Sequence, residues 1–224
     1  MPPYHGLSSG GDQRRVTYEL FRQPPEVAAD AGSNKAIIKR LVPDAFQDPG
    51  VTASSFVSKY WEIYNRDFLS NPNTNGKVFE ALISMALCRE GVLPHYIQAK
   101  ITHIPGVNYD CIIYTEEFGP ISISAKTSLR ERWKQADLEA LALKNIFRKS
   151  QSYLVSMSEM EISRRKRDPD SVLALNGFIL ASAPEFDALL ARIRGYTLME
   201  APNLPAISSN ETVLTAETCQ TYYA

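Results

Sequence analysis

Four polar residues between positions 110 and 139 have the types and spacing of a hydrolytic metal site. Asp110 opens one apolar segment, and Ser124 and Lys126 close the next one as Ser-Ala-Lys. Glu139 follows inside an amphipathic segment. Two carboxylates and a backbone carbonyl suffice for Mg²⁺, which prefers oxygen ligands and keeps several waters. The predicted metal ligands are therefore Asp110, Glu139 and the carbonyl of Ala125, and the chemistry that they suggest is hydrolysis of a phosphodiester.

Lys126 is the residue predicted to act on the attacking water. Hydrolysis of a phosphodiester needs a cation on the phosphate, an activated water and charge relief for the leaving oxygen. A lysine beside the metal can orient the water, deprotonate it or stabilise the charged phosphorus centre. These three roles remain open for Lys126 on the sequence alone.

The strands that would carry these residues are predicted from alternation and apolar runs. Ile121, Ile123 and Ala125 alternate with polar residues, which is the pattern of a strand with two different faces. If a tight turn follows the strand of Asp110, Lys126 lies almost opposite it, roughly 5 Å away across the ladder. Strands are predicted at Tyr96–Ile104, Tyr109–Thr115, Ile121–Lys126, Ser152–Ser156 and Leu173–Ala181, with a late edge strand in the tail after Glu200.

Helical spacing of apolar residues predicts helices around these strands. The strongest helix, at 130–148, has an apolar stripe and beside it a polar row of Arg132, Gln135 and Glu139. A segment at 36–42 is compatible with either a strand or a helical turn. The order of elements predicts an α/β protein with a mixed sheet flanked by helices on both faces. The other helices are predicted at 53–69, 76–90, 159–167 and 184–193.

Composition favours one globular domain. The chain has 224 residues, ordinary apolar content and a net charge of −1. We expect a single domain over 1–224 that begins with an arm at 1–34, because this stretch is rich in Gly, Pro, Ser and Gln. A net charge near zero argues against a protein that coats nucleic acid, but it is compatible with a locally basic cleft.

Several other classes of protein lack support. The three cysteines form no CxxC pair, which argues against a disulfide framework or a zinc ribbon and suits a reducing cytoplasm. The three histidines have no HxH or HExxH spacing, and no phosphate-binding glycine motif occurs. No apolar run approaches the roughly 20 residues of a membrane span, and no secretory signal is visible. We therefore expect a cytoplasmic protein that is not bound to a membrane.

The order Asp110, Ser124, Lys126, Glu139 resembles the PD-(D/E)XK nuclease superfamily, in the variant with its second acid on the following helix (D…SxK…E). The run KTSLRERW that begins at Lys126 resembles type II restriction endonucleases akin to EcoRII. The run GKVFEALISMAL resembles the helix that often precedes this core and carries an auxiliary glutamate, here Glu80. Judged by helix geometry alone, Glu80 is a solvated residue at the edge of the apolar face of its helix. The resemblance covers residues 76–181, the expected catalytic core.

Two positions depart from the usual pattern of this superfamily. Tyr109 stands where proline usually precedes the first aspartate, and Ser124 stands where the central motif usually has an acid. The resemblance implies that Glu139 replaces that missing acid. Asp137, on the same predicted helix, is the alternative.

The resemblance implies a Mg²⁺-dependent type II restriction endonuclease. Such an enzyme would be a homodimer that cuts double-stranded DNA at a short, near-palindromic site, because two-fold protein symmetry matches two-fold DNA symmetry. One alternative is another nuclease with the same core, acting in repair or recombination. A second is a DNA-binding protein without catalytic activity, which Ser124 in the acidic position keeps open.

The start of the helix after Lys126 is the predicted place of base reading. Arginine can contact guanine O6 and N7, and glutamate can accept a hydrogen bond from cytosine N4. An exposed, solvated helix start is the competing interpretation. The basic run Arg164–Arg167 is interpreted as an exposed helix end. The predicted DNA-binding residues are Arg130, Glu131, Arg132 and Gln135.

Overall fold

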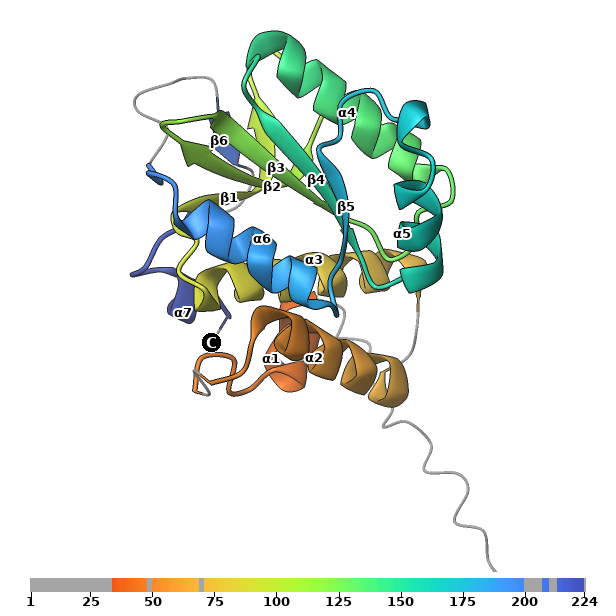
Figure 1. Cartoon of the computed structure of the whole chain (residues 1–224). Coiled ribbons are helices and arrows are strands. Elements are labelled where there is room, and N and C mark those ends of the chain that lie inside the picture. Colours follow the sequence, from red (N-terminus) through yellow and green to blue (C-terminus); the bar gives the residue numbers. More distant parts are fainter. Residues whose placement is uncertain (1–33, 48–49, 69–70, 200–206, 210–212, 224) are drawn as a thin grey trace, which may run out of the picture.

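The structure is a computed structural model that describes residues 34–47, 50–68, 71–199, 207–209 and 213–223. The predicted N-terminal arm lies outside these residues except for Asn34, which begins the first helix. The described residues form a mixed sheet with helices on both faces (Figure 1), as predicted for an α/β protein.

The sheet joins an antiparallel half to a parallel half. Strands β1, β2 and β3 are antiparallel neighbours, while β4 and β5 continue the sheet in parallel with β3. The order across the sheet is β5-β4-β3-β2-β1-β6, and β7 also pairs with β1. The strands are β1 (His95–Ile101), β2 (Tyr109–Thr115), β3 (Gly119–Ala125), β4 (Gln151–Ser156), β5 (Gly177–Leu180), β6 (Ile207–Ser209) and β7 (Val213–Leu214).

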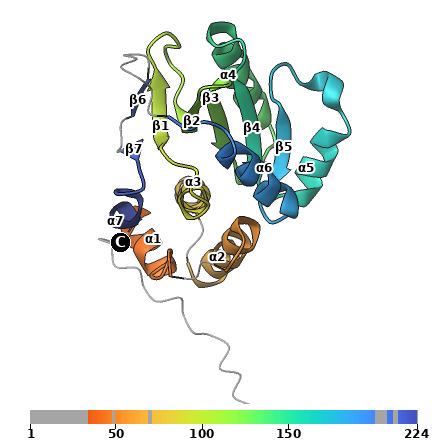
Figure 2. The same cartoon turned by 60° about the vertical axis from the view of Figure 1, so that its left-hand side comes forward.

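Two groups of helices cover the two faces of the sheet. One face packs mainly against α3, with α1, α2 and α6 around it, and Figure 2 shows α3 nearly end-on between the sheet and the α1–α2 pair. The other face packs against α4 and α5. The helices are α1 (Asn34–Leu41), α2 (Ala53–Asp67), α3 (Pro72–Arg89), α4 (Arg132–Ile146), α5 (Glu159–Lys166), α6 (Pro184–Arg194) and α7 (Cys219–Tyr223).

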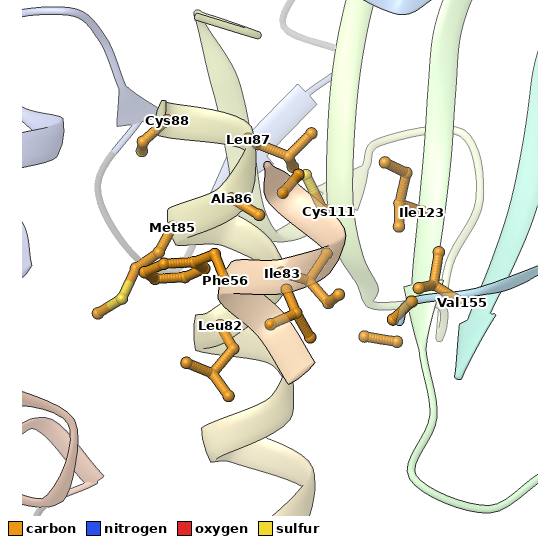
Figure 3. Packing of buried hydrophobic residues seen from close by; sticks show 14 of the residues in the cluster. Phe56, Leu82, Ile83, Met85, Ala86, Leu87, Cys88, Cys111, Ile123 and Val155 are labelled. Carbon is orange, nitrogen blue, oxygen red and sulfur yellow. The ribbon is translucent and has the colours of Figure 1, made fainter. Parts of the chain in front are cut away.

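Helix α3 forms the centre of the larger core. Its apolar side chains, among them Ile83 and Leu87, lie opposite Cys111, Ile123 and Val155 of the sheet (Figure 3). All five side chains are buried. Tight packing of this kind resists displacement of the helix. The core therefore fixes α3 relative to the strands that carry the candidate site.

The segment at 36–42, which was compatible with a strand or a helical turn, is helical as far as Leu41, where α1 ends. The predicted starts of α3 and β5 need correction. Helix α3 begins at Pro72, four residues before the predicted start, because Asn71 caps it by accepting hydrogen bonds from the N–H groups of Asn73 and Thr74. Strand β5 begins at Gly177 and not at Leu173.

Candidate active site

Asp110 and Lys126 meet where β2 and β3 lie side by side. The register pairs Cys111 with Ile123, which places Asp110 level with Ser124 and not with Lys126. The prediction that Asp110 and Lys126 are almost opposite was therefore wrong by two residues. The long Lys126 side chain closes the difference, and its Nζ lies 2.8 Å from Oδ2 of Asp110.

One oxygen of Asp110 accepts three hydrogen bonds. Oδ2 accepts from Nζ of Lys126 at 2.8 Å, from the backbone N–H of Ala125 at 2.9 Å and from Oγ of Ser124 at 3.3 Å. The Asp110 and Lys126 side chains are only 11% and 15% exposed, unlike an ordinary surface ion pair. Since none of the described residues donates to Oδ1, this oxygen is the one available to a cation.

The carbonyl of Ala125 shares the edge of β3 that Asp110 contacts. The N–H of Ala125 points to Asp110, whereas the N–H of Lys126 points the other way and bonds to the carbonyl of Val155 on β4. In an extended strand the N–H and C=O of one residue point to the same side. The predicted carbonyl ligand therefore lies on the same side of the strand as the carboxylate.

Two further acids surround this ion pair. Glu80 from α3 and Glu139 from α4 lie close enough that their charges act on Lys126. Burial raises the pKa of Glu80, and the charge of Asp110 raises it further against the opposing effect of Lys77. Burial likewise raises the pKa of Glu139, which Gln135 and Lys126 only partly offset. The four side chains thus form one cluster with more acidic than basic groups, which favours a cation.

Lys126 remains firmly protonated in this cluster. Burial alone lowers the pKa of its ammonium group, but the carboxylates of Asp110, Glu139 and Glu80 outweigh burial and raise the pKa above its usual value. A lysine in this state can donate hydrogen bonds and stabilise negative charge. It is a poor base.

Asp137 has a structural role and is not at the cluster. Its side chain is buried and accepts hydrogen bonds from the backbone N–H groups of Leu173, Ala174 and Leu175 at 2.7 to 2.9 Å. These bonds hold the segment before β5 in a non-strand conformation, which explains the late start of that strand. Of the two helical acids considered from the sequence, only Glu139 faces Asp110 and Lys126.

The donor set fits a hard cation. Among the described residues, no group of three His, Cys, Asp or Glu side chains is close enough to hold a metal by itself. Mg²⁺ does not require such a cage, because it is commonly bound by one or two carboxylates together with waters and substrate phosphates. Asp110, Glu139 and the carbonyl of Ala125 supply oxygen donors of the required kind.

The predicted DNA-binding residues divide into two pairs. Gln135 donates a hydrogen bond to Oε1 of Glu139 at 2.8 Å, and Arg132 lines a groove of about 550 Å³ together with Glu80. Both are therefore close to the acidic cluster. Arg130 and Glu131 are exposed in the loop before α4, which begins at Arg132 and not at Arg130, and Glu131 forms an exposed ion pair with Lys134.

Glu161 on α5 is a residue that the sequence did not single out. Its carboxylate accepts hydrogen bonds from the N–H groups of Leu129 and Arg130 at 2.9 and 3.3 Å and from Oγ of Ser128 at 3.4 Å. Partial burial raises its pKa, but hydrogen bonds from the two backbone N–H groups and from the side chains of Ser158 and Ser128 together outweigh burial and hold that pKa below its ordinary value. Glu161 therefore fixes the loop that joins Lys126 to α4.

The Glu161→Gln variant should lose the charge-assisted part of these hydrogen bonds, which are worth about 1.5–3 kcal/mol each. We expect DNA cleavage to slow by about tenfold, because the loop that connects Lys126 to α4 is less well fixed. The matched control is Glu159→Gln, which removes the same charge from an exposed position on the same helix. Equal cleavage rates for the two variants would remove Glu161 from the site.

Tyr109 and Gln98 make two more contacts that the sequence did not indicate. The hydroxyl of Tyr109, the residue in place of the usual proline, donates to the backbone carbonyl of Glu139 at 3.0 Å and so ties α4 to β2. Gln98 on β1 donates to Oε2 of Glu80 at 2.8 Å. Neither contact follows from a local pattern, because each joins a strand to a helix that is distant in sequence.

The described residues have a restriction-endonuclease-like fold, with a mixed sheet flanked by helices. A solved structure that shares this fold is the complex of the restriction endonuclease PspGI with substrate DNA. Its TM-score to this chain is 0.50 at 18% sequence identity, and the alignment covers 77% of this chain and 84% of the PspGI chain. No protein-family model and no curated protein matches the sequence. In the described part of the chain, no helix is both long and apolar enough to cross a membrane.

Proposed function

We propose that this protein is a Mg²⁺-dependent type II restriction endonuclease that cuts double-stranded DNA at a short, near-palindromic site. It would act as a homodimer in the cytoplasm, since a two-fold symmetric site is matched by a two-fold symmetric protein. The observation that carries the proposal is the largely buried Asp110–Lys126 pair, flanked by Glu80 and Glu139 on a restriction-endonuclease-like fold. Without that cluster the fold alone would carry no function.

Asp110 is the residue that would anchor the cation. Three donors engage Oδ2, so they hold the carboxylate in one orientation and leave Oδ1 for coordination. Ser124 is one of these donors. Ser124 replaces the acid that is usual at this position. It would not bind the metal itself but would orient Asp110, which does.

Lys126 would hold the attacking water and the negative charge of the phosphate. Its raised pKa argues against the role of general base, which the sequence left open. The protonated ammonium group of Lys126 lies 2.8 Å from Asp110. It can therefore donate a hydrogen bond to a water or phosphate oxygen that is bound beside that carboxylate. Mg²⁺, when bound, would polarise the phosphate and lower the pKa of a water.

Glu139 would complete the metal site from α4. Gln135 donates to its carboxylate, and Tyr109 donates to its backbone carbonyl and so ties α4 to β2. Arg132 would approach the DNA from the same helix, because it lines the groove beside Glu80. Arg130 and Glu131, on the exposed loop, would read base edges or contact phosphates as the DNA enters.

Protonation of the two outer acids should compete with the cation. Glu80 and Glu139 have raised pKa values in the folded protein, so their contribution to stability is present below the ordinary glutamate pKa and is lost as the pH rises through the raised values. A cation bound by ionised Glu139, next to ionised Glu80, reverses this loss. We therefore expect Mg²⁺ to raise the melting temperature more at about pH 8 than at about pH 5, measured by calorimetry. If Mg²⁺ raised the melting temperature equally at both pH values, a metal site at these acids would be contradicted.

Cleavage of phage DNA tests the proposed function. The protein is incubated with phage DNA and Mg²⁺, and the products are separated on a gel. Discrete bands are expected of a restriction endonuclease. A smear would indicate a nuclease of the same core without strict sequence specificity, and intact DNA would indicate a binding protein.

Two observations favour the alternative of a DNA-binding protein without activity. Ser124 replaces an acid, and no three acidic, histidine or cysteine side chains among the described residues converge tightly enough to hold a metal. A DNA-binding protein without activity would bind a specific duplex equally well with and without Mg²⁺ and would leave it uncut.

A further inference from the structure

Gln98 has an unusual backbone conformation within a strand. Its φ is +49°, and among the described residues it is the one non-glycine residue with a positive φ. A side chain with a Cβ is disfavoured in this left-handed region, and glutamine has no special tolerance for it. Such a conformation persists only where surrounding contacts impose it, and it occurs often at functional sites.

The ladder between β1 and β2 changes at Gln98. The register pairs Ile97 with Cys111 and Ala99 with Tyr109, and the step between these pairs would join Gln98 to Asp110. No pairing is made at that step. Gln98 therefore lies directly across from Asp110, the aspartate of the candidate site.

Both strands change face at this step. Ile97 and Cys111 pack in the core around α3, whereas Ala99 and Tyr109 belong to the cluster that packs against α4. Residues two apart in a regular strand share a face. The left-handed turn at Gln98 therefore coincides with a rotation of both strands.

The side chain of Gln98 connects two parts of the site. Its Nε2 donates to Oε2 of Glu80 at 2.8 Å, and its Oε1 accepts from Nδ2 of Asn108 at 2.7 Å. Lys77 donates to the same Oε2 of Glu80 at 2.8 Å. Because a carboxylate only accepts and the amide of Asn108 donates, these two contacts determine the orientation of the Gln98 amide.

From these observations we infer that Gln98 is a positioning residue for the reaction: its left-handed backbone turns its amide towards Glu80 and holds that carboxylate beside Asp110. The inference rests on the proposed function, since it assigns a role within the same site. Gln98 does not touch the metal or the DNA in this role. It fixes the acid on α3, which would otherwise be oriented by the exposed Lys77 alone.

The Gln98→Gly variant tests this inference, because glycine adopts a positive φ without strain but has no amide. We expect the metal-free protein to be more stable, with a melting temperature higher by about 2 °C. We expect Mg²⁺ affinity and the maximal rate of DNA cleavage each to fall by about tenfold, while affinity for DNA in Ca²⁺ stays within about twofold. If Gln98 only stabilised the fold, its replacement by glycine would lower the melting temperature.

The control is Lys100→Gly, an exposed position two residues further along the same strand with an ordinary φ. It should lower the melting temperature, because glycine weakens a strand, and leave Mg²⁺ affinity unchanged. A Gln98→Gly variant that melts lower than wild type, or that binds Mg²⁺ as wild type does, would overturn the inference. Calorimetric titration of Mg²⁺ needs no cleavage, so it decides the role of Gln98 even if the wild-type protein cuts no DNA and the proposed function fails.

Discussion

The Lys126→Met variant should bind DNA but cut it about a thousandfold more slowly than wild type. Methionine keeps much of the volume of the lysine stem but removes the ammonium group that contacts Asp110 at 2.8 Å. The water and the phosphate then lose their cationic partner, while the three acids nearby lose the charge that offsets their repulsion. Single-turnover cleavage of a duplex with the recognition site, with binding measured separately in Ca²⁺, checks this result.

Lys144→Met is the matched control for Lys126→Met. Lys144 lies exposed in the last turn of α4, so its replacement removes the same charge without touching the acidic cluster. It should cut at close to the wild-type rate. If both variants cut alike, Lys126 has no part in the chemistry, and the assignment of the site to this end of β3 is wrong.

The second large effect distinguishes the two acids of α4. Glu139→Gln should abolish most cleavage but leave the metal-free protein at least as stable as wild type at neutral pH. The sign follows from its raised pKa, because ionised Glu139 destabilises the fold above that pKa and an uncharged amide does not. Thermal unfolding without metal and cleavage with Mg²⁺ are the two measurements.

Asp137→Asn should show the opposite behaviour. Its carboxylate accepts three backbone hydrogen bonds, and an amide in its place would turn a donor towards at least one of those N–H groups. We expect a loss of about 3 kcal/mol of stability, with cleavage retained in proportion to the folded fraction. If Asp137→Asn is stable and inactive while Glu139→Gln cuts normally, the helical acid has been misassigned.

Local patterns in the sequence were sufficient for most of the fold. The alternation around Ile121 and the apolar run at 109–115 predicted β3 and β2 closely, and the latter strand has the predicted bounds. The apolar stripe of α4 is likewise buried at Trp133, Ala136 and Leu143. These features depend on which residues face the core, which the spacing of apolar residues determines directly.

Contacts between distant segments account for the differences. The carboxylate of Glu161 accepts hydrogen bonds from the N–H groups of Leu129 and Arg130. These residues therefore form a loop, and α4 starts two residues later than predicted. Asp137 delays β5 in the same way. No local pattern encodes an acid that bonds to backbone groups some thirty residues away.

The candidate site was predictable in its residues but not in its geometry. The spacing of Asp110 and Lys126 indicated the pair, yet the register places Ser124 opposite Asp110 and the lysine reaches across by its length. The left-handed backbone at Gln98 has no signal in the sequence, because glutamine is not a residue that favours it. The side chain of Gln98 contacts Glu80 on α3 and Asn108, and no local pattern around position 98 encodes these contacts.

Cleavage by wild type and by Asp110→Asn, side by side on phage DNA with and without Mg²⁺, tests the central claim most directly. Asparagine keeps the size of the side chain but removes the charge that would bind the cation and that pairs with Lys126. We predict discrete fragments from the wild-type protein with Mg²⁺, and intact DNA from the wild type without Mg²⁺ and from the variant under both conditions. Fragments from Asp110→Asn, or from the wild-type protein in the absence of a divalent cation, would contradict a metal-dependent nuclease site at Asp110.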